Sequence, residues 1–184
     1  NNPGRLRPQS RIVFDYAGQV DDVELLNNCI MELYQHLNVN DSLILVSVNG
    51  ISGRSANTSY LRVSGHVINN DANGWYSGGA CISLVGSGNQ MLFGTGQWSN
   101  MDISKPSGNV YMTSNINFIS DSWLTGTATA NMLNAPGHLR TLGNMSFNYA
   151  GTVDDLELLG NGNITLTGDL NIANTLTLTS VNII

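Results

Sequence analysis

The sequence has few charged residues and almost no lysine. Asp, Glu, Lys and Arg together make up 11% of its 184 residues, the formal net charge is -6, and Lys105 is the single lysine. The six arginines are scattered, so no clustered basic face is expected for phosphate groups. Nucleic acid is therefore excluded as the expected partner. Uncharged Asn, Ser, Thr and Gly must cover the surface, which is usual in extracellular all-β proteins.

Long apolar runs and closely spaced cysteines are also missing. No stretch approaches the 18 consecutive apolar residues typical of a membrane-spanning helix, so we expect no membrane insertion. The N-terminal "NNPGRLRPQS" has no apolar signal core, which suggests a mature or excised segment. Cys29 and Cys81 lie 52 residues apart, which fits neither a CxxC redox motif nor a zinc knuckle. They are either two buried thiols or a disulfide, because sequence cannot place their Cα atoms.

One passage is present twice. Residues 1–51 align with residues 134–184 at a fixed offset of 133 without a gap, and 25 of the 51 positions are identical. "DYAGQVDDVELL" at 15–26 matches "NYAGTVDDLELL" at 148–159. We interpret residues 1–184 as one segment with an internal repeat, cut from a longer array.

The two copies resolve an ambiguity in secondary structure. Residues 22–37 alone resemble an amphipathic helix, with apolar residues spaced by three and four. The matching "LELLGNGNITLTGDLNI" contains three glycines and alternates apolar with polar residues, which indicates strands with one buried face. We therefore predict strands in both copies and through the whole chain, at residues 12–16, 23–26, 30–34, 37–39, 43–48, 60–63, 66–68, 81–85, 90–93, 101–103, 110–112, 116–119, 145–149, 156–158, 164–167, 170–172 and 176–181.

The spacing of these strands predicts an all-β, right-handed parallel β-helix. Many lie only six to nine residues apart and end at a Gly, Asn or Asp turn residue, which is tight for the hairpins of a sandwich. A coil of three short strands per turn, about twenty residues long, fits better, with successive coils about 4.8 Å apart. Aliphatic residues would point inward, and about nine coils would form a rod. Residues 51–80 depart from the repeat and suggest a loop insertion.

Two stretches resemble β-helical repeats in very large surface proteins of the Bacteroidetes. They are "GSGNQMLFGTGQWSNMDISKPSGNVYMTSNINF" at 86–118 and "NITLTGDLNIANTLTLTS" at 163–180. Those proteins are exported by the type IX secretion system and include gliding-motility adhesins. The matching residues are Gly88, Asn89, Gln90, Trp98, Asn100, Ile103, Lys105, Ser107, Gly108, Val110, Ser114 and Asn115. The resemblance implies a repeat style and a cell-surface setting, and no particular activity. "CIMELYQHL" in the first copy departs from the pattern.

The acidic motif "VDDxELL" is a candidate metal site. Asp21, Asp22 and Glu24 are repeated as Asp154, Asp155 and Glu157. Hard oxygen ligands suit Ca²⁺, which rigidifies many extracellular rods. The alternative is that the aspartates accept hydrogen bonds from backbone amides, since the motif lacks the spacing of a calcium loop. We expect no other cofactor.

Aromatic residues and histidines complete the candidates. Trp75 and Tyr76, in "NGWYSGG", either stack on sugar rings or cover one end of the apolar core. His36, His66 and His138 have no metal-site spacing and accompany no nucleophile motif, so they are expected at the surface or in turns.

We therefore predict a structural and adhesive repeat segment of an extracellular bacterial surface protein or filament. Its expected partners are neighbouring repeats or subunits of the same protein, and surface polysaccharide is a further expected partner. A carbohydrate-binding module is the alternative. A polysaccharide-cleaving β-helix is less favoured, because adjacent residues on a strand point to opposite faces, which makes Asp21 and Asp22 a poor catalytic pair. The prediction is that the chain is not an enzyme.

Overall fold

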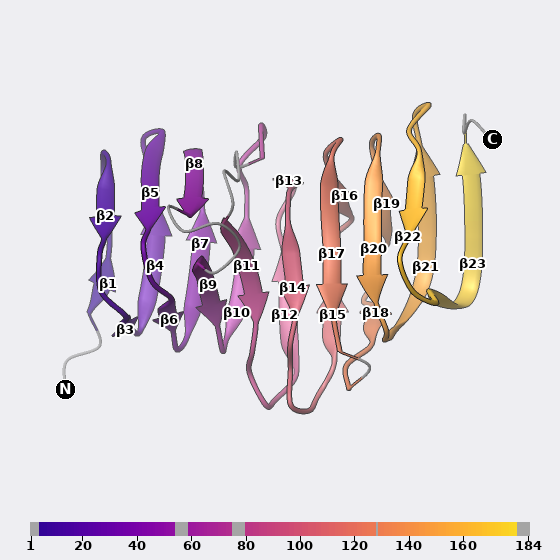
Figure 1. Cartoon of the computed structure of the whole chain (residues 1–184), viewed down its shortest axis with the longest axis horizontal. Coiled ribbons are helices and arrows are strands. Elements are labelled where there is room, and N and C mark those ends of the chain that lie inside the picture. The colour runs from indigo at the N-terminus through magenta and orange to yellow at the C-terminus, as the bar shows by residue number, and fades with distance from the viewer. Residues whose placement is uncertain (1–3, 54–58, 75–79, 128, 180–184) are drawn as a thin grey trace.

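The chain winds into a right-handed parallel β-helix, as predicted. The computed structural model describes residues 4–53, 59–74, 80–127 and 129–179, and every strand pair among them is parallel. Figure 1 shows the coils side by side along the long axis, from the N-terminal coil at one end to β23 at the other. The eight-stranded sheet contributes one strand to each of eight coils.

Each coil passes three faces in the order 1, 2, 3. Face 1 holds β1 (Arg5–Leu6), β4 (Asp22–Leu25), β7 (Ser42–Leu45), β10 (His66–Asn69), β12 (Gln90–Phe93), β15 (Val110–Met112) and β18 (Met132–Asn134). Face 2 holds β2 (Ile12–Phe14), β5 (Cys29–Leu33) and β8 (Val48–Gly53), and further along β13 (Gln97–Trp98), β16 (Ile116–Phe118) and β19 (Leu139–Thr141).

Face 3 is the eight-stranded sheet. It holds β3 (Gly18–Val20), β6 (Leu37–Val39), β9 (Ser59–Val63), β11 (Ala80–Leu84), β14 (Met101–Ile103), β17 (Ser122–Gly126), β20 (Met145–Tyr149) and β22 (Ile164–Leu166). Two longer strands, β21 (Thr152–Leu159) and β23 (Asn171–Thr179), turn the corner from face 1 to face 2. Through them, the strands of face 1 join β19, β16 and β13 of face 2 in one 12-stranded sheet, whereas β2, β5 and β8 form a separate three-stranded sheet.

Inward side chains stack into continuous columns. On face 1, Val23, Leu43, Val67 and Leu92 are in register and each is 0% exposed. Burying one such side chain contributes about 1.5–3 kcal/mol. The predicted interior is aliphatic, but rings and methionines also line it: Trp98 is the register partner of Phe118 on face 2, and both are 0% exposed.

The strand assignment replaces the apparent helix at residues 22–37. β4 and β5 occupy this segment, and between them Asn27 and Asn28 have φ of 56°. Gly160, the counterpart of Asn27, has φ of 75°. Asparagine and glycine adopt left-handed backbone most readily, so both copies can turn this corner and neither can continue a helix.

Some strand boundaries differ from the predicted ones. The predicted strand at 43–48 is two strands, because Val46 lies at a corner between β7 and β8 and is 42% exposed. The predicted strands at 170–172 and 176–181 are joined in β23 (Asn171–Thr179), and residues 180 and 181 lie outside the described residues. The prediction missed β1, β3, β13, β17, β18 and β19, which lack a long aliphatic alternation.

The stretch 51–80 contains ordinary coil strands. β9 and β10 pair in register with the coils before and after them. The coil steps here are longer: Leu37 pairs with Leu61, 24 residues on, whereas Gly18 pairs with Leu37, 19 residues on.

Asparagine side chains hold the corners of successive coils together. The Oδ1 atom of Asn89 accepts a hydrogen bond from the backbone N–H of Asn109 at 3.0 Å. Asn109 accepts in the same way from Asn131, and Asn131 from Thr152, both at 3.2 Å. Each bond satisfies a backbone donor at a position where the strand ladder is interrupted.

The two copies occupy different faces. β1 belongs to face 1, and its counterpart 133 residues later, β19, belongs to face 2. The stack from β1 through β4, β7, β10, β12 and β15 to β18 makes six coil steps, and β19 is the next strand along the chain. The 133-residue offset therefore equals six coils plus one face, and the second copy is turned by one face about the axis.

Candidate functional site

Two rows of polar side chains cross the outer surface of face 2 in the last coils. The histidine row consists of Asn115, His138, Asp155 and Thr175. The arginine row consists of Asn117, Arg140, Glu157 and Thr177, which are register partners in β16, β19, β21 and β23. Between the rows lie inward residues of the core such as Leu139 and Leu156.

Hydrogen bonds and ion pairs link each row from coil to coil. The backbone N–H of His138 donates to Asn115 Oδ1 at 3.2 Å, and His138 Nδ1 lies 3.1 Å from Asp155 Oδ2. Asp155 Oδ1 accepts from the N–H of Thr175 at 2.9 Å. In the arginine row, Nε of Arg140 lies 2.5 Å from Oε2 of Glu157. Both rows are thus built from partners in neighbouring coils.

The first copy has the same linkages on face 1. Nε of Arg7 lies 2.6 Å from Oε2 of Glu24, as in the pair of Arg140 with Glu157. Asp22 Oδ1 accepts from the N–H of Ser42 at 3.1 Å, as Asp155 does from Thr175. Arg5, the counterpart of His138, lies 3.8 Å from Asp22 and 3.2 Å from Glu24. In both copies, therefore, the acidic motif links neighbouring coils through hydrogen bonds and ion pairs.

These contacts favour the charged form of the carboxylates. Partial burial opposes ionisation of Asp155, but hydrogen bonds from Asn134 and Thr175 and the nearby His138 outweigh it, so its pKa lies below its ordinary value. The pKa of Glu24 is also lowered, because bonds from Arg7 and Arg5 outweigh its partial burial.

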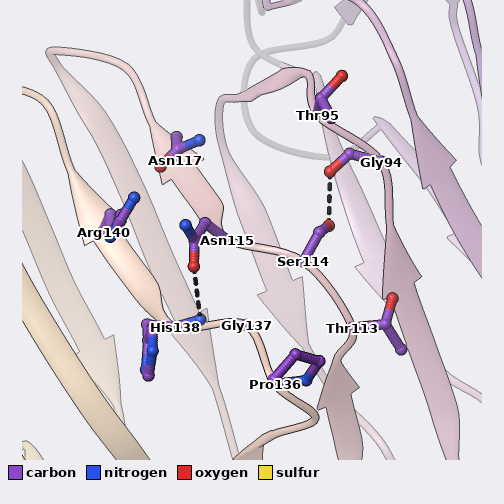
Figure 2. Close-up of a pocket in the computed structure, with 10 residues that line it drawn as sticks. All are labelled: Gly94, Thr95, Thr113, Ser114, Asn115, Asn117, Pro136, Gly137, His138 and Arg140. Atoms are coloured by element: carbon purple, nitrogen blue, oxygen red, sulfur yellow. Dashed lines mark hydrogen bonds between the residues drawn. The ribbon is translucent and has the colours of Figure 1, made fainter.

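A groove of about 530 Å³ lies beside the two rows. Its lining is shown in Figure 2: Gly94, Thr95, Thr113, Ser114, Asn115, Asn117, Pro136, Gly137, His138 and Arg140. A second hollow of about 250 Å³ lies on the other side of His138 and Arg140, lined also by Asp155, Leu156, Glu157, Thr175 and Thr177. Amide, hydroxyl, imidazole and guanidinium groups therefore line this surface together with apolar atoms.

The groove depends on a tight approach between coils. A Cβ on Gly137 would lie 1.9 Å from the backbone O of Ser114, so only glycine allows this turn to stack on the coil below. Ser114 Oγ in turn donates to the backbone O of Gly94 at 2.5 Å, a bond drawn in Figure 2. Three successive coils are therefore held together along the floor of the groove.

The acidic residues predicted to bind calcium have protein partners. Besides the contacts above, Asp21 Oδ1 accepts from Asn40 Nδ2 at 3.2 Å, and Asp154 Oδ2 accepts from the N–H of Asn134 at 2.9 Å. Among the described residues, no group of three or more His, Cys, Asp or Glu is placed to hold a metal ion. Calcium at this motif stays a prediction, and the structure adds a specific alternative, which is bonding between coils.

The other sequence candidates lie apart. Trp75 and Tyr76 lie outside the described residues. His36 contacts Tyr60 at a ring distance of 5.3 Å, His66 contacts Phe93 at 6.0 Å, and only His138 lines the groove. Both cysteines are buried free thiols, and Cys29 Sγ lies 2.7 Å from the backbone O of Ser10. In the part of the chain that the structure describes, no helix could span a lipid bilayer.

Residues of the quoted stretch 86–118 meet in the structure. The Nζ atom of Lys105, which is 1% exposed, donates to the backbone O of Gly86 at 2.7 Å and of Gly88 at 2.8 Å, and to Gln90 Oε1 at 2.6 Å. Burial lowers the pKa of Lys105 to about 8. Lys105 therefore fastens one turn to the next coil, which is a structural role.

The predicted site residues did not include the groove. Its signal is a polar-apolar-polar triplet at coil spacing: "NIN" at 115–117, "HLR" at 138–140, "DLE" at 155–157 and "TLT" at 175–177. The steps between triplets are 23, 17 and 20 residues, so no fixed period shows them. Only the coil register brings them together.

Comparison with known proteins adds no relative. Neither the family models, nor the curated proteins, nor the solved structures include a match to this chain. The function must therefore be inferred from the fold and from this polar surface.

Proposed function

We propose that this chain is a structural and adhesive repeat segment of an extracellular bacterial surface protein or filament. The observation that carries this proposal is the identical coil register of the two copies. Val23 pairs with Leu43 as Leu156 pairs with Leu176, and Ile12 pairs with Met31 as Met145 pairs with Ile164. Half of the side chains differ between the copies, and the coil geometry is unchanged.

The core explains why such a segment would be stiff. The core is one continuous cluster of buried residues, and on faces 1 and 3 the inner strands bond to the coil on either side. In such a stack every coil contacts only its neighbours, so length can be added by repetition without a new core. A load along the rod would act on the backbone hydrogen bonds between successive coils, which the three faces supply together.

The surface supports an extracellular, adhesive role. Only 11% of residues are charged, the outer positions are rich in Asn, Ser and Thr, and the sequence resembles surface proteins of the Bacteroidetes. Uncharged amides and hydroxyls offer many weak hydrogen bonds to polysaccharide or to another rod. Many weak contacts along a stiff body add up to firm attachment.

The rod can be tested by length. Tandem chains of one, two and three 133-residue units should lengthen by about 30 Å per unit, since each adds six coils and one face at about 4.8 Å per coil. Small-angle scattering measures this increment. A compact particle whose longest dimension does not grow with unit number would contradict the rod.

The cellular setting needs its own experiment. An antibody against the chain should label intact cells of the source organism, and external protease should remove the label without lysis. Beads coated with the chain should also adhere to surface polysaccharide of that organism. Labelling only after permeabilisation would reject the surface assignment, and beads that behave like albumin-coated ones would reject adhesion.

A second candidate function is carbohydrate binding in the groove. The amides and hydroxyls of the lining, together with His138 and the ion-paired Arg140, offer both donors and acceptors to a neutral, hydroxyl-rich ligand. The predicted aromatic contacts, Trp75 and Tyr76, would be a separate sugar site. Either site, the groove or the aromatic pair, would give saturable binding on a glycan array.

Matched variants separate the two sugar sites. Asn117→Ala in the groove should weaken glycan binding several-fold, whereas Gln19→Ala, an exposed strand residue far along the chain, should have no effect. Loss of binding on Trp75→Ala and Tyr76→Ala alone would place the site there instead. Release of reducing ends in the same assay would indicate cleavage and contradict the expectation that the chain is not an enzyme.

A further inference from the structure

The coil at the C-terminal end presents inward-type leucines to solvent. Leu166, Leu176 and Leu178 are 55%, 50% and 49% exposed. Their counterparts in the first copy, Leu33, Leu43 and Leu45, are each 0% exposed. The same residues are therefore core in one copy and uncovered edge in the other, and β22 and β23 form that edge (Figure 1).

The first copy shows what covers these leucines. The next coil, β8 to β10, stacks on them in a defined register: Gly53 on Leu33, Val67 on Leu43 and Asn69 on Leu45. Between these strands, β9 places Leu61 on Leu37 and Val63 on Val39. The covering layer is thus a coil with the sequence pattern of residues 48–69.

The N-terminal coil of a second copy fits this edge less well. Its counterpart within the chain, at residues 138–153, stacks on β16, β17 and β18 through Ile116, Leu124 and Met132. No coil of that type stacks on residues equivalent to 164–178 anywhere in the described chain. The N-terminal coil is also less exposed, because Phe14 is only 9% exposed and Leu6 and Ile12 pack partly against the core.

We propose that the edge formed by β22 and β23 binds a coil with the sequence pattern of residues 48–69, in the register of the first copy. The strands equivalent to β9 and β10 lie along β23. The residue equivalent to Val67 then covers Leu176, and the one equivalent to His66 lies beside Thr175. This inference depends only on coil register and holds whether or not the rod is adhesive.

The test attaches the covering coil to the full chain. Residues 180–184 read "SVNII" and match "SVNGI" at 47–51, so a second copy of residues 52–69 is joined directly after Ile184. Thr175→Cys is combined with His66→Cys in the joined segment only. Parallel neighbours lie about 4.8 Å apart, which is within the Cα range of a disulfide. The native Cys29 and Cys81 are 0% and 2% exposed and should not compete.

The expected result is near-complete formation of this disulfide under mild oxidation, with slowed hydrogen exchange in β23 and a higher urea midpoint than that of residues 1–184. The control carries Asp in place of Leu61 and Val67 in the joined segment and should lose all three effects. A second control moves the introduced cysteine from His66 to Arg62 of the joined segment, whose register partner is equivalent to Asn171, and should not crosslink to position 175.

Two outcomes would overturn the proposal. In one, the joined segment exchanges as fast as the Asp control and the disulfide with position 175 does not exceed the Arg62 control. In the other, sedimentation shows that residues 1–184 form head-to-tail dimers that protect β23 to the same degree, so that a second copy is the better occupant. Neither outcome bears on cell-surface labelling or adhesion, which are measured separately.

Discussion

The two copies of the repeat are one sequence pattern placed on two different parts of the same coil. The first copy starts on face 1 and the second on face 2, yet the partners within each copy are the same. Met31 becomes Ile164, Glu32 becomes Thr165 and Asn27 becomes Gly160 without a change of register. The comparison shows that the same strand pattern can occupy different faces of the coil, because each face offers the same parallel pairing to a strand of suitable length.

The differences between the copies identify what the pattern requires. Inward positions stay apolar, the left-handed corner stays Asn or Gly, and the acidic residues keep a cation in the preceding coil. Outward positions change freely, as at Tyr34 and Thr167. A series of matched substitutions in the two copies can test each of these requirements.

The largest effect is expected from emptying the core. Phe147→Ala should lower the free energy of unfolding by about 3–5 kcal/mol, because its ring is 0% exposed between coils and leaves a cavity. The matched Phe14→Ala should cost clearly less, since Phe14 lies in the first described coil. Urea denaturation of both variants measures the difference. Equal losses of unfolding free energy in the two variants would mean that the position of a core residue along the rod does not affect its contribution to stability.

A smaller effect is expected at the left-handed corner. Gly160→Ala should cost about 1–2 kcal/mol, since φ there is 75° and an L residue other than Asn or Asp is strained. Gly160→Asn should cost less, because it restores the residue that the first copy uses at Asn27. Thermal or urea unfolding ranks the two variants, and the opposite ranking would contradict the requirement for this conformation.

Acid should weaken both copies through their carboxylates. The pKa values of Asp155 and Glu24 are lower in the folded than in the unfolded chain, where they are about 3.9 and 4.3. Their contribution is therefore complete above these unfolded values and is lost as pH falls through the lower folded ones. Urea midpoints between pH 7 and 2.5 should fall along this course. Asp155→Asn should flatten the fall, and an unchanged profile would remove Asp155 as a cause.

The smallest effect is expected from single ion pairs. Arg140→Gln and the matched Arg7→Gln should each cost less than about 1 kcal/mol, because both pairs are partly exposed. Arg140→Gln should cost slightly more, since its side chain is 30% exposed against 55% for Arg7. High salt should reduce both losses. A larger loss for Arg7 would reverse the inferred order.

Local patterns in the sequence were sufficient to predict the class of fold and the equivalence of the two copies. Alternation such as "ITLTGDLNI" requires strands with one buried side, and the glycines of the second copy exclude a helix in the first. These features are local, because they depend on the spacing of residues within one strand or one turn. They were enough to predict coils of about twenty residues and most strand positions.

The residues that are neighbours across coils could be identified only from the folded arrangement. The steps between paired residues vary from 17, as for Leu6 and Val23, to 25, as for Val67 and Leu92, so a fixed period cannot align them. The groove beside His138 and Arg140, the turn of the second copy by one face, and the partners of the acidic motif all depend on that register. The physical reason is that stacking satisfies backbone hydrogen bonds between coils, whereas the residues added at corners are free to differ in number.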